Sequence, residues 1–321
     1  MLAEIRKIQI GSTLVSKTPV LVPSFSSKGF PEVDKIVETL SQTITESTLL
    51  SAYDIAHGYI KTTPTFPSFF FLDSGGYECS RDIELSDNRK NNYVETPWTQ
   101  EQLEGVLNSW NPPQPTIAIS YDHPKHRIGV NEQIRAARNL LANRNFGREI
   151  LIKPITVDSG RIDMPSVLES LRDCHDFDVI GFTEKELGYS LFKRMQNISA
   201  IRRGLTKAGL DTPIHIFGSL DTVSTPLYFL SGADIFDGLT WLRYAYVDDQ
   251  AIYSKNLAAL SWGIHINDQS IDPRIWAQNY QVLATLQSRM KRFVKDKNYD
   301  VFGARLGAFF KDAIQNLEAE E

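Results

Sequence analysis

Residues 69–77 read Phe-Phe-Phe-Leu-Asp-Ser-Gly-Gly-Tyr, a short apolar run that ends in an aspartate and is followed by small residues. A second run of the same kind, Ala-Asp-Ile-Phe-Asp-Gly-Leu-Thr-Trp-Leu-Arg, occupies residues 233–243. In both, a run typical of a buried strand stops at an acidic residue, Asp73 or Asp237. A lone aspartate at such a position is most often a cap or turn residue. Two of them indicate a site, because glycosyl chemistry uses one carboxylate as nucleophile and one as acid/base.

Similar apolar runs recur along the first three quarters of the chain. They are largely apolar rather than alternating, as expected for strands that are buried on both faces of a parallel sheet. The predicted strands occupy residues 19–23, 48–53, 69–73, 116–122, 150–156, 178–182, 213–217 and 233–236. Eight strands with intervening helices match the α/β class and the element count of a (β/α)8 TIM barrel. An open doubly wound sheet is the alternative, although no glycine-rich phosphate-binding turn follows the first strand.

Amphipathic helices are predicted between the strands and after the last of them, because apolar residues recur there every three or four positions. These patterns cover residues 33–44, 131–141, 163–171, 187–205, 273–296 and 302–317. We therefore predict a (β/α)8 catalytic domain over residues 1–250 and a helical C-terminal extension over residues 251–321 that packs on it. The polar segment 74–114 is predicted to be a long insertion after the third strand.

Composition and charge exclude several classes of protein. The chain has 321 residues, of which 42% are hydrophobic, and its formal net charge of −5 does not fit a globally basic nucleic-acid coat. Its two cysteines, Cys79 and Cys174, make neither a disulfide framework nor a zinc quartet. Neither a signal peptide nor a membrane span is recognisable. We therefore expect a cytoplasmic protein with no membrane partner.

Polar residues follow most of the predicted strands, at the ends where the catalytic residues of a (β/α)8 barrel lie. They are Asp73, Asp122, Lys153, Thr183 with Glu184, Gly218 with Ser219, and Asp237. Single members of this set could cap helices or form ion pairs, but three aspartates brought together repel one another unless a ligand or cation uses them. Neighbouring glycines would let a planar ligand approach the backbone, and Tyr77 offers an aromatic face. The glycines are Gly75, Gly76, Gly218 and Gly238.

Histidines and basic segments have structural and functional interpretations. His123 and His126 do not indicate a metal site, because no third ligand stands at a recognisable spacing, and His215 is interpreted as a hydrogen-bonded core residue. Three segments are locally basic, which is typical of a solvated helix face but also of a track for a phosphate backbone. The residues that we assign to such a track are Lys125, Arg127, Arg202, Arg203 and Arg292.

Two stretches together resemble the signature motifs of the tRNA-guanine transglycosylase superfamily. They are Asp-Ser-Gly-Gly-Tyr at 73–77 and Gly-Ala-Asp-Ile-Phe-Asp at 232–237, and weaker similarity in the same order extends over residues 15–245. Enzymes of this superfamily are (β/α)8 barrels that exchange a guanine in a polynucleotide for a 7-deazaguanine. The resemblance therefore implies a pentosyltransferase that needs no redox or nucleotide cofactor.

The resemblance also implies roles for individual residues. Asp237 matches the nucleophile of the superfamily, and Asp73 matches its acid/base carboxylate. Tyr77 matches the aromatic residue that stacks on the base, and Ser74 lies in the same pocket. Asp122 matches the aspartate that reads the guanine edge.

Other positions match less directly or depart from the pattern of the superfamily. Phe217 and Gly218 match the floor of the pocket, whereas Lys153 stands where the superfamily has a glutamine. The paired glycines that follow the sixth strand are replaced around Glu184, which becomes a candidate base contact and leaves the identity of the incoming base open. Glu78 replaces the usual glutamine.

Residues 238–321 contain no cysteine, whereas superfamily members that act on tRNA carry three closely spaced cysteines and a histidine for a structural zinc. The zinc is therefore predicted to be absent. Zinc-free relatives include enzymes that insert 7-deazaguanines into DNA, so the resemblance favours DNA over tRNA. A homodimer or the partner proteins of a modification system fit this branch. Two alternatives stay open, namely a barrel hydrolase that only releases the base and a non-catalytic subunit that binds nucleic acid.

Overall fold

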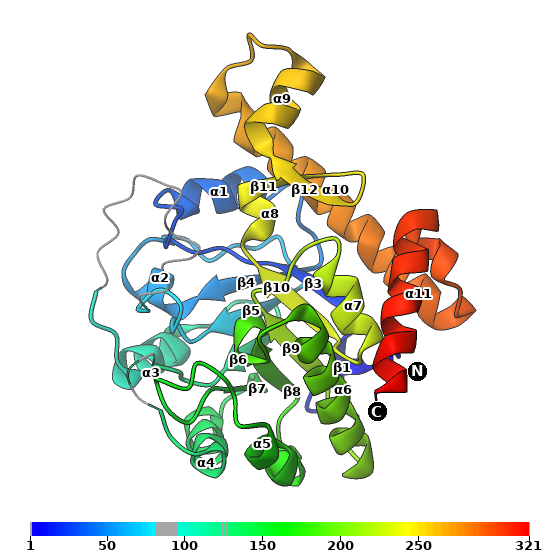
Figure 1. Ribbon diagram of the computed structural model, residues 1–321. Helices are drawn as coiled ribbons and strands as arrows, with labels where there is room; N and C mark the ends of the chain where they lie inside the picture. The colour runs from blue at the N-terminus through cyan, green and yellow to red at the C-terminus, as the bar shows by residue number, and fades with distance from the viewer. Residues whose placement is uncertain (1, 81–95, 124, 126, 321) are drawn as a thin grey trace. The chain divides into compact units, whose positions relative to one another are not determined.

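The protein is described by a computed structural model that covers residues 2–80, 96–123, 125 and 127–320. Within these ranges, eight strands form one hydrogen-bonded sheet in the order β3-β10-β9-β8-β7-β6-β5-β4 (Figure 1). The strands are β3 (Val20–Pro23), β4 (Ser47–Ser51), β5 (Phe69–Asp73), β6 (Thr116–Ile119), β7 (Gly147–Ile152), β8 (Val179–Thr183), β9 (Ile214–Phe217) and β10 (Ile235–Gly238). All eight predicted strands are confirmed, as is the α/β class. The first strand lies beside the last, which is the strand order of a (β/α)8 barrel.

Helices follow most of these strands along the chain. They are α1 (Val33–Leu40), α2 (Ala52–Ala56), α3 (Gln100–Ser109), α4 (Val130–Leu141), α5 (Met164–Ser170), α6 (Leu191–Lys207), α7 (Ser224–Leu230) and α8 (Thr240–Arg243), with short 3₁₀ helices at Leu171–Cys174 and Glu184–Glu186. The four helical patterns predicted between the strands are confirmed as α1, α4, α5 and α6, whereas α2, α7 and α8 are additional.

Helix α3 lies inside the segment 74–114 that was expected to be a long loop. It begins at a capping box, in which the Thr99 N–H donates to Gln102 Oε1 at 2.9 Å and the Gln102 N–H donates to Thr99 Oγ1 at 3.4 Å. A part of the predicted insertion, residues 81–95, lies outside the described residues. The segment thus contains a helix, and the insertion after the third strand stays a prediction.

The chain forms two compact units, and each is described by itself. The N-terminal unit comprises residues 9–15 and 24–181. Its strands β4, β5, β6 and β7 pair in parallel, and Phe70, Phe71 and Leu72 of β5 are completely buried. Ser24 forms a parallel bridge with Leu49 of β4, and helix α4 packs beside β7. Aromatic and aliphatic side chains thus fill both faces of β5, as continuous apolar runs require.

The C-terminal unit comprises residues 1–8, 16–23 and 182–321. Strands β3, β10 and β9 pair in parallel, with Ile235 between Val20 and His215. Helix α10 (Asp268–Asp296) lies against β3, where the Leu21 N–H donates to Gln287 Oε1 at 2.8 Å. Residues 251–321 therefore belong to the same unit as three strands of the sheet. The predicted domain boundary at residue 250 stays a prediction.

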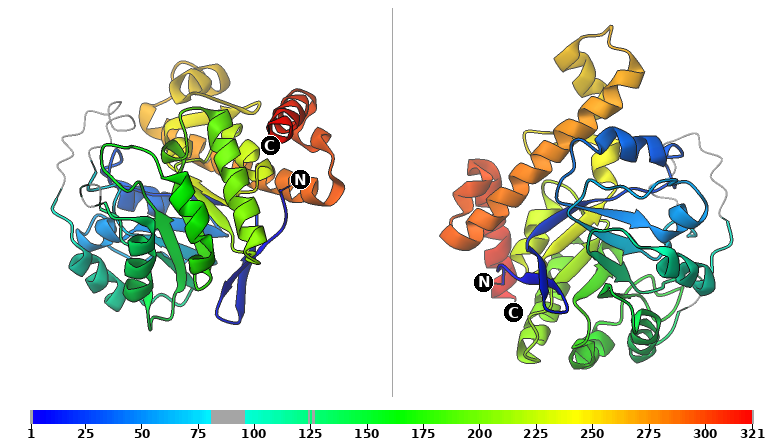
Figure 2. Two further views of the ribbon diagram at one scale, coloured as in Figure 1. Left: turned by 60° about the horizontal axis from the view of Figure 1, so that its bottom comes forward. Right: turned by 180° about the vertical axis from the view of Figure 1, so that it is seen from behind.

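The end of the chain is mainly helical, as predicted, but it begins with a hairpin that the sequence analysis missed. Its elements are β11 (Tyr244–Val247), β12 (Gln250–Tyr253), α9 (Ser254–Trp262), α10, a 3₁₀ helix at Tyr299–Phe302 and α11 (Ala304–Ala319). Asp248 and Asp249 form the hairpin turn with positive φ values of 48° and 61°. Figure 2 shows α10 along its length, with α9 near one end and α11 near the other.

One helix boundary and one small sheet differ from the expectation. Helix α10 begins at Asp268 rather than at residue 273, because Asn267 Oδ1 accepts a hydrogen bond from the Gln269 N–H at 2.9 Å and caps the helix. Strands β1 (Lys7–Ile10) and β2 (Thr13–Lys17) form a two-stranded sheet that was not predicted. No helix in the described part of the chain combines the length and the apolar character that crossing a bilayer requires.

Candidate active site

Asp73 ends strand β5 at a buried position of the N-terminal unit. Its side chain is 8% exposed, and its partner in β4 is Ser51. The Gly75 N–H donates a hydrogen bond to Asp73 Oδ2 at 2.9 Å. This tight turn is possible because Gly75 adopts a positive φ of 91°, which an L side chain rarely does. The local sequence therefore places a carboxylate at the end of a strand, as the motif indicates.

The two glycines after Ser74 provide space for side chains of the protein. A Cβ atom on Gly75 would lie 2.7 Å from Tyr53 Cβ, and one on Gly76 would lie 2.2 Å from Asp122 Oδ1. The space that a Cβ would take at these two positions is therefore occupied, and the approach of a planar ligand to the backbone here stays a prediction. Gly218 differs, because no described atom lies within 4 Å of a Cβ built on it.

Asp122 is contacted by two of the other predicted base-binding residues. Its Oδ1 accepts a hydrogen bond from the hydroxyl of Ser74, which is itself completely buried. Its Oδ2 lies 3.9 Å from Lys153 Nζ. The backbone of Lys153 is held in turn by the Gln133 side chain, which accepts from the Lys153 N–H at 2.8 Å and donates to its carbonyl at 2.9 Å. The structure thus brings Ser74, Asp122 and Lys153 together and adds Gln133, for which the sequence carries no signal.

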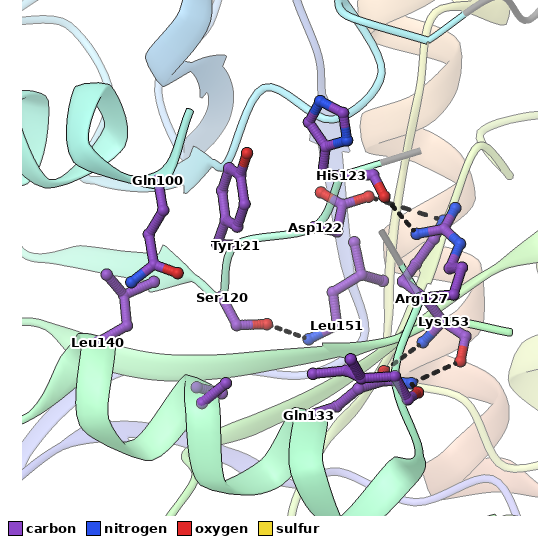
Figure 3. A pocket seen from close by; sticks show the side chains of 13 residues that line it. Gln100, Ser120, Tyr121, Asp122, His123, Arg127, Gln133, Leu140, Leu151 and Lys153 are labelled. Carbon is purple, nitrogen blue, oxygen red and sulfur yellow. Dashed lines mark hydrogen bonds and ion pairs between the residues drawn. The ribbon is translucent and has the colours of Figure 1, made fainter. Parts of the chain in front are cut away.

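A pocket of about 290 Å³ opens beside Asp122, between α4 and the ends of β6 and β7 (Figure 3). Apolar side chains such as Leu140 and Leu151 line one part of it, and polar side chains line the rest. The polar group comprises Gln100, Ser120, Tyr121, Asp122, His123, Arg127, Gln133 and Lys153. This combination of an apolar wall and a few polar groups is typical of sites for small molecules.

Tyr77 is contacted by a buried lysine that the sequence analysis did not single out. Lys28 is 3% exposed, and its ammonium lies 4.6 Å from the centroid of the Tyr77 ring. The same ammonium donates hydrogen bonds to the Tyr77 carbonyl at 2.9 Å and to Ser80 Oγ at 2.9 Å. The cation and the hydrogen bonds hold the segment that follows Asp73.

Two further carboxyl groups are buried near this segment. Glu78 accepts hydrogen bonds from Ser26 Oγ at 2.5 Å and Ser51 Oγ at 2.8 Å, whereas Asp54 accepts from the Ser27 N–H at 2.8 Å and from Ser27 Oγ at 2.5 Å. Burial raises the pKa of Asp54 and the pKa of Glu78 to about 7, and repulsion by Asp54 also raises the pKa of Glu78. Asp54 and Glu78 thus form a buried acidic pair.

Asp237 is the last residue but one of strand β10 in the C-terminal unit and is 6% exposed. Its Oδ1 lies 3.4 Å from Nε2 of the completely buried His215, and the Gly218 N–H approaches the same oxygen at 3.4 Å. The His215 ring stacks on Phe217, with the ring centroids 4.0 Å apart. Gly218 therefore contacts Asp237 directly, and Phe217 stacks on the histidine beside it, while the assignment of Phe217 and Gly218 to the pocket floor stays a prediction. That Asp73 and Asp237 act on one ligand stays a prediction.

Glu184 directly follows β8, and its carboxylate contacts side chains of the same unit. Its Oε1 accepts hydrogen bonds from Arg194 Nη1 at 2.8 Å and from the Tyr228 hydroxyl at 2.7 Å. Burial raises the pKa of Glu184, although its contacts with Tyr228 and Arg194 oppose this rise. Its predicted role as a base contact stays a prediction.

The five cations assigned to a phosphate track differ in their surroundings. Arg202 is 1% exposed, donates to the carbonyls of Gly232 and Thr212 at 2.9 and 3.0 Å, and forms an ion pair with the buried Asp234. It cannot reach a phosphate, so its assignment is wrong. Because Arg202 lies in a basic run, the sequence suggested an exposed side chain, whereas the side chain is buried. Arg203 and Lys125 are exposed, Arg127 is half-buried, and Arg292 is exposed but lies 3.2 Å from Asp296.

Within the described ranges, no group of three or more histidine, cysteine or acidic side chains is arranged to hold a metal ion. His123 lines the pocket of Figure 3, and His126 lies outside the described residues. A comparison of the chain with models of protein families finds no match, and a comparison with curated proteins finds none either.

Proposed function

We propose that this protein is a guanine transglycosylase that exchanges guanine in a polynucleotide for a 7-deazaguanine through a covalent glycosyl-aspartate. The observation that carries the proposal is a pair of buried carboxylates, Asp73 and Asp237, each of which lies at or next to the last residue of a strand of the sheet, within a glycine-containing motif. A nucleophile and an acid/base are the two groups that such an exchange requires. DNA is the proposed polymer, because residues 238–321 hold no cysteines for the zinc of relatives that modify tRNA.

In the first half-reaction, the target guanine leaves the base stack and enters the site. Tyr77 stacks on it, and the Asp122 carboxylate accepts hydrogen bonds from N1–H and from the exocyclic amine. Asp237 attacks C1′ while the bond between C1′ and N9 breaks, and Asp73 gives a proton to the departing guanine. The sugar remains bound to Asp237 as an ester.

In the second half-reaction, the incoming 7-deazaguanine loses the proton on N9 to Asp73. Its N9 then forms a bond with C1′, and the ester bond to Asp237 breaks and restores the carboxylate. One N-glycosidic bond replaces another of similar energy, so no energy source is needed. The hydrogen bond from Ser74 supports this scheme, because it orients Asp122 and leaves lone pairs of the carboxylate for the base.

The test is the incorporation of labelled guanine into duplex DNA, single-stranded DNA and tRNA, each followed by digestion and mass analysis. We expect incorporation into DNA and a covalent protein–DNA adduct, both lowered at least about 1,000-fold by Asp237→Ala. Asp312→Asn, which changes an exposed carboxylate of α11, serves as the control and should behave as the wild type. Incorporation that survives in Asp237→Ala would refute the role of Asp237. Release of guanine without incorporation would establish a hydrolase instead.

A further inference from the structure

His215 occupies a position in strand β9 where an apolar residue would be expected. The residues on either side, Ile214 and Ile216, are completely buried, and so is His215 itself. An imidazole that is removed from water loses hydrogen bonds to solvent, so a buried histidine needs a polar neighbour that compensates for them. The carboxylate of Asp237 is a polar neighbour of this ring, because Oδ1 lies 3.4 Å from Nε2, although the two atoms do not have the geometry of a hydrogen bond.

The register of the sheet explains why these two side chains meet. His215 pairs with Ile235 of β10, and Asp237 lies two residues further along that strand. Residues two apart in a strand point to the same face, so His215 and Asp237 are diagonal neighbours on one face. Phe217 lies on this face of β9 as well, and its ring stacks on the imidazole at an interplanar angle of 30°. The stacking limits rotation of the imidazole and keeps Nε2 close to Asp237 Oδ1.

Building on the proposed function, we propose that His215 is a positioning residue that orients the carboxylate of Asp237 for its attack on C1′. The imidazole Nε2 and the Gly218 N–H both approach Asp237 Oδ1. Such contacts restrict rotation of the carboxylate before the sugar arrives.

His215→Phe keeps an aromatic ring against Phe217 but removes the nitrogen, whereas His215→Gln returns an N–H donor near the position of Nε2. We expect His215→Phe to slow formation of the covalent adduct roughly 10- to 100-fold, the size that loss of one contact with a charged group implies. The affinity for the polynucleotide should not change, since Asp237 contributes to the reaction and not to binding of the backbone. His215→Gln should recover most of the rate.

Ile216→Val is the matched control, because Ile216 lies next to His215 in β9 and is equally buried. It tests whether any small change in the packing of this strand slows the adduct, and we expect it to react as the wild type does. The melting temperature of each variant shows that it is folded. The inference is overturned if His215→Phe forms the adduct at the wild-type rate, or if Ile216→Val slows it as much.

A second measurement separates this inference from the proposed function. ¹⁵N NMR of histidine-labelled protein reports on the ring nitrogens of His215, and we expect Asp237→Asn to shift the Nε2 resonance. An unchanged resonance would show that the two side chains do not interact and would overturn the inference, whatever the enzyme catalyses. If Asp237→Asn shifts the resonance but the wild-type protein forms no adduct, the proposed function is refuted, whereas the contact between His215 and Asp237 stands.

Discussion

Gly76 lies so close to the carboxylate of Asp122 that no side chain fits between them. A Cβ at this position would lie within 2.5 Å of all three atoms of the carboxyl group. The hydroxyl of Ser74 donates to the same carboxylate. Two small residues of one short segment, Ser74 and Gly76, therefore surround Asp122. From the sequence, the glycines indicate room for a ligand. In the folded protein, the carboxylate of Asp122 occupies the space beside Gly76.

For this residue we expect Gly76→Ala to displace Asp122 and to lower the affinity for guanine at least about 10-fold, because one charged hydrogen-bond acceptor would be misplaced. Isothermal titration with guanine measures the change. Gly105→Ala is the control, since a Cβ there meets no atom within 4 Å and lies in helix α3, where alanine is favoured over glycine. Wild-type affinity in Gly76→Ala would show that Asp122 does not read the base.

Several elements of the N-terminal unit converge on the buried acidic pair of Asp54 and Glu78. Asp54 lies in α2 and contacts Ser27, which follows β3 along the chain, whereas Glu78 contacts Ser26 and Ser51, the last residue of β4. Repulsion by the carboxylate of Asp73, at the end of β5, also raises the pKa of Asp54. Serine hydroxyls connect these elements where the apolar core ends. Such buried carboxyl groups make the stability of the unit depend on pH.

We expect the stability of the protein to fall as the pH rises from about 4 to about 7. The pKa values of Asp54 and Glu78 rise on folding from ordinary values of 3.8 and 4.5 to about 7, so in this range the folded state holds protons that the unfolded chain has lost. Glu78→Gln removes one of these ionisations and should lessen the fall. Urea denaturation at pH 5 and pH 8 measures it.

The control for this experiment is Glu38→Gln, which changes an exposed carboxyl group of helix α1. It should leave the difference in unfolding free energy between the two pH values as it is in the wild type. The same pH dependence in Glu78→Gln and the wild type would mean that Glu78 is not protonated on folding.

At the scale of the whole molecule, one buried aspartate joins segments from both ends of the chain. Asp234 precedes β10 and is completely buried, and it pairs with Arg202 of α6 and, at 3.0 Å, with Arg6 near the N-terminus. The Ile214 N–H at the start of β9 also donates to it at 2.8 Å. These contacts fasten residues 1–8 to the last strands of the C-terminal unit. A buried aspartate with two arginines and a backbone donor is well compensated.

Arg202→Met would remove one partner of the buried Asp234 and leave its negative charge less compensated. We therefore expect this variant to be destabilised by roughly 3–5 kcal/mol. Arg203→Met is the control, because Arg203 is the next residue and is exposed on the same helix. It should change the unfolding free energy little and should instead weaken binding of DNA at low salt. Chemical denaturation and a filter-binding titration measure the two effects. Equal stability of the two variants would contradict the structural role of Arg202.

The strands and most of the helices of this protein are determined by the sequence itself. Strands that are buried on both faces must be apolar throughout, so runs such as Phe69–Asp73 are visible without any knowledge of their neighbours. The same holds for helices with an apolar face, such as α4 and α6. The capping box before α3 and the Asp248-Asp249 turn are local signals too, and α3 also carries a short apolar period at Leu103, Val106 and Leu107 that the sequence analysis overlooked.

Only the tertiary structure decided which polar side chains meet. Ser74 and Asp122 are 48 residues apart, and Arg202 and Asp234 are 32 residues apart, so no local pattern connects them. The pairing of His215 with Asp237 depends on the register between β9 and β10. Apolar burial is a property of each segment by itself, whereas a hydrogen bond or ion pair requires two segments to be neighbours in a particular register. For this reason the acidic residues could be found from the sequence, and the groups that hold them could not.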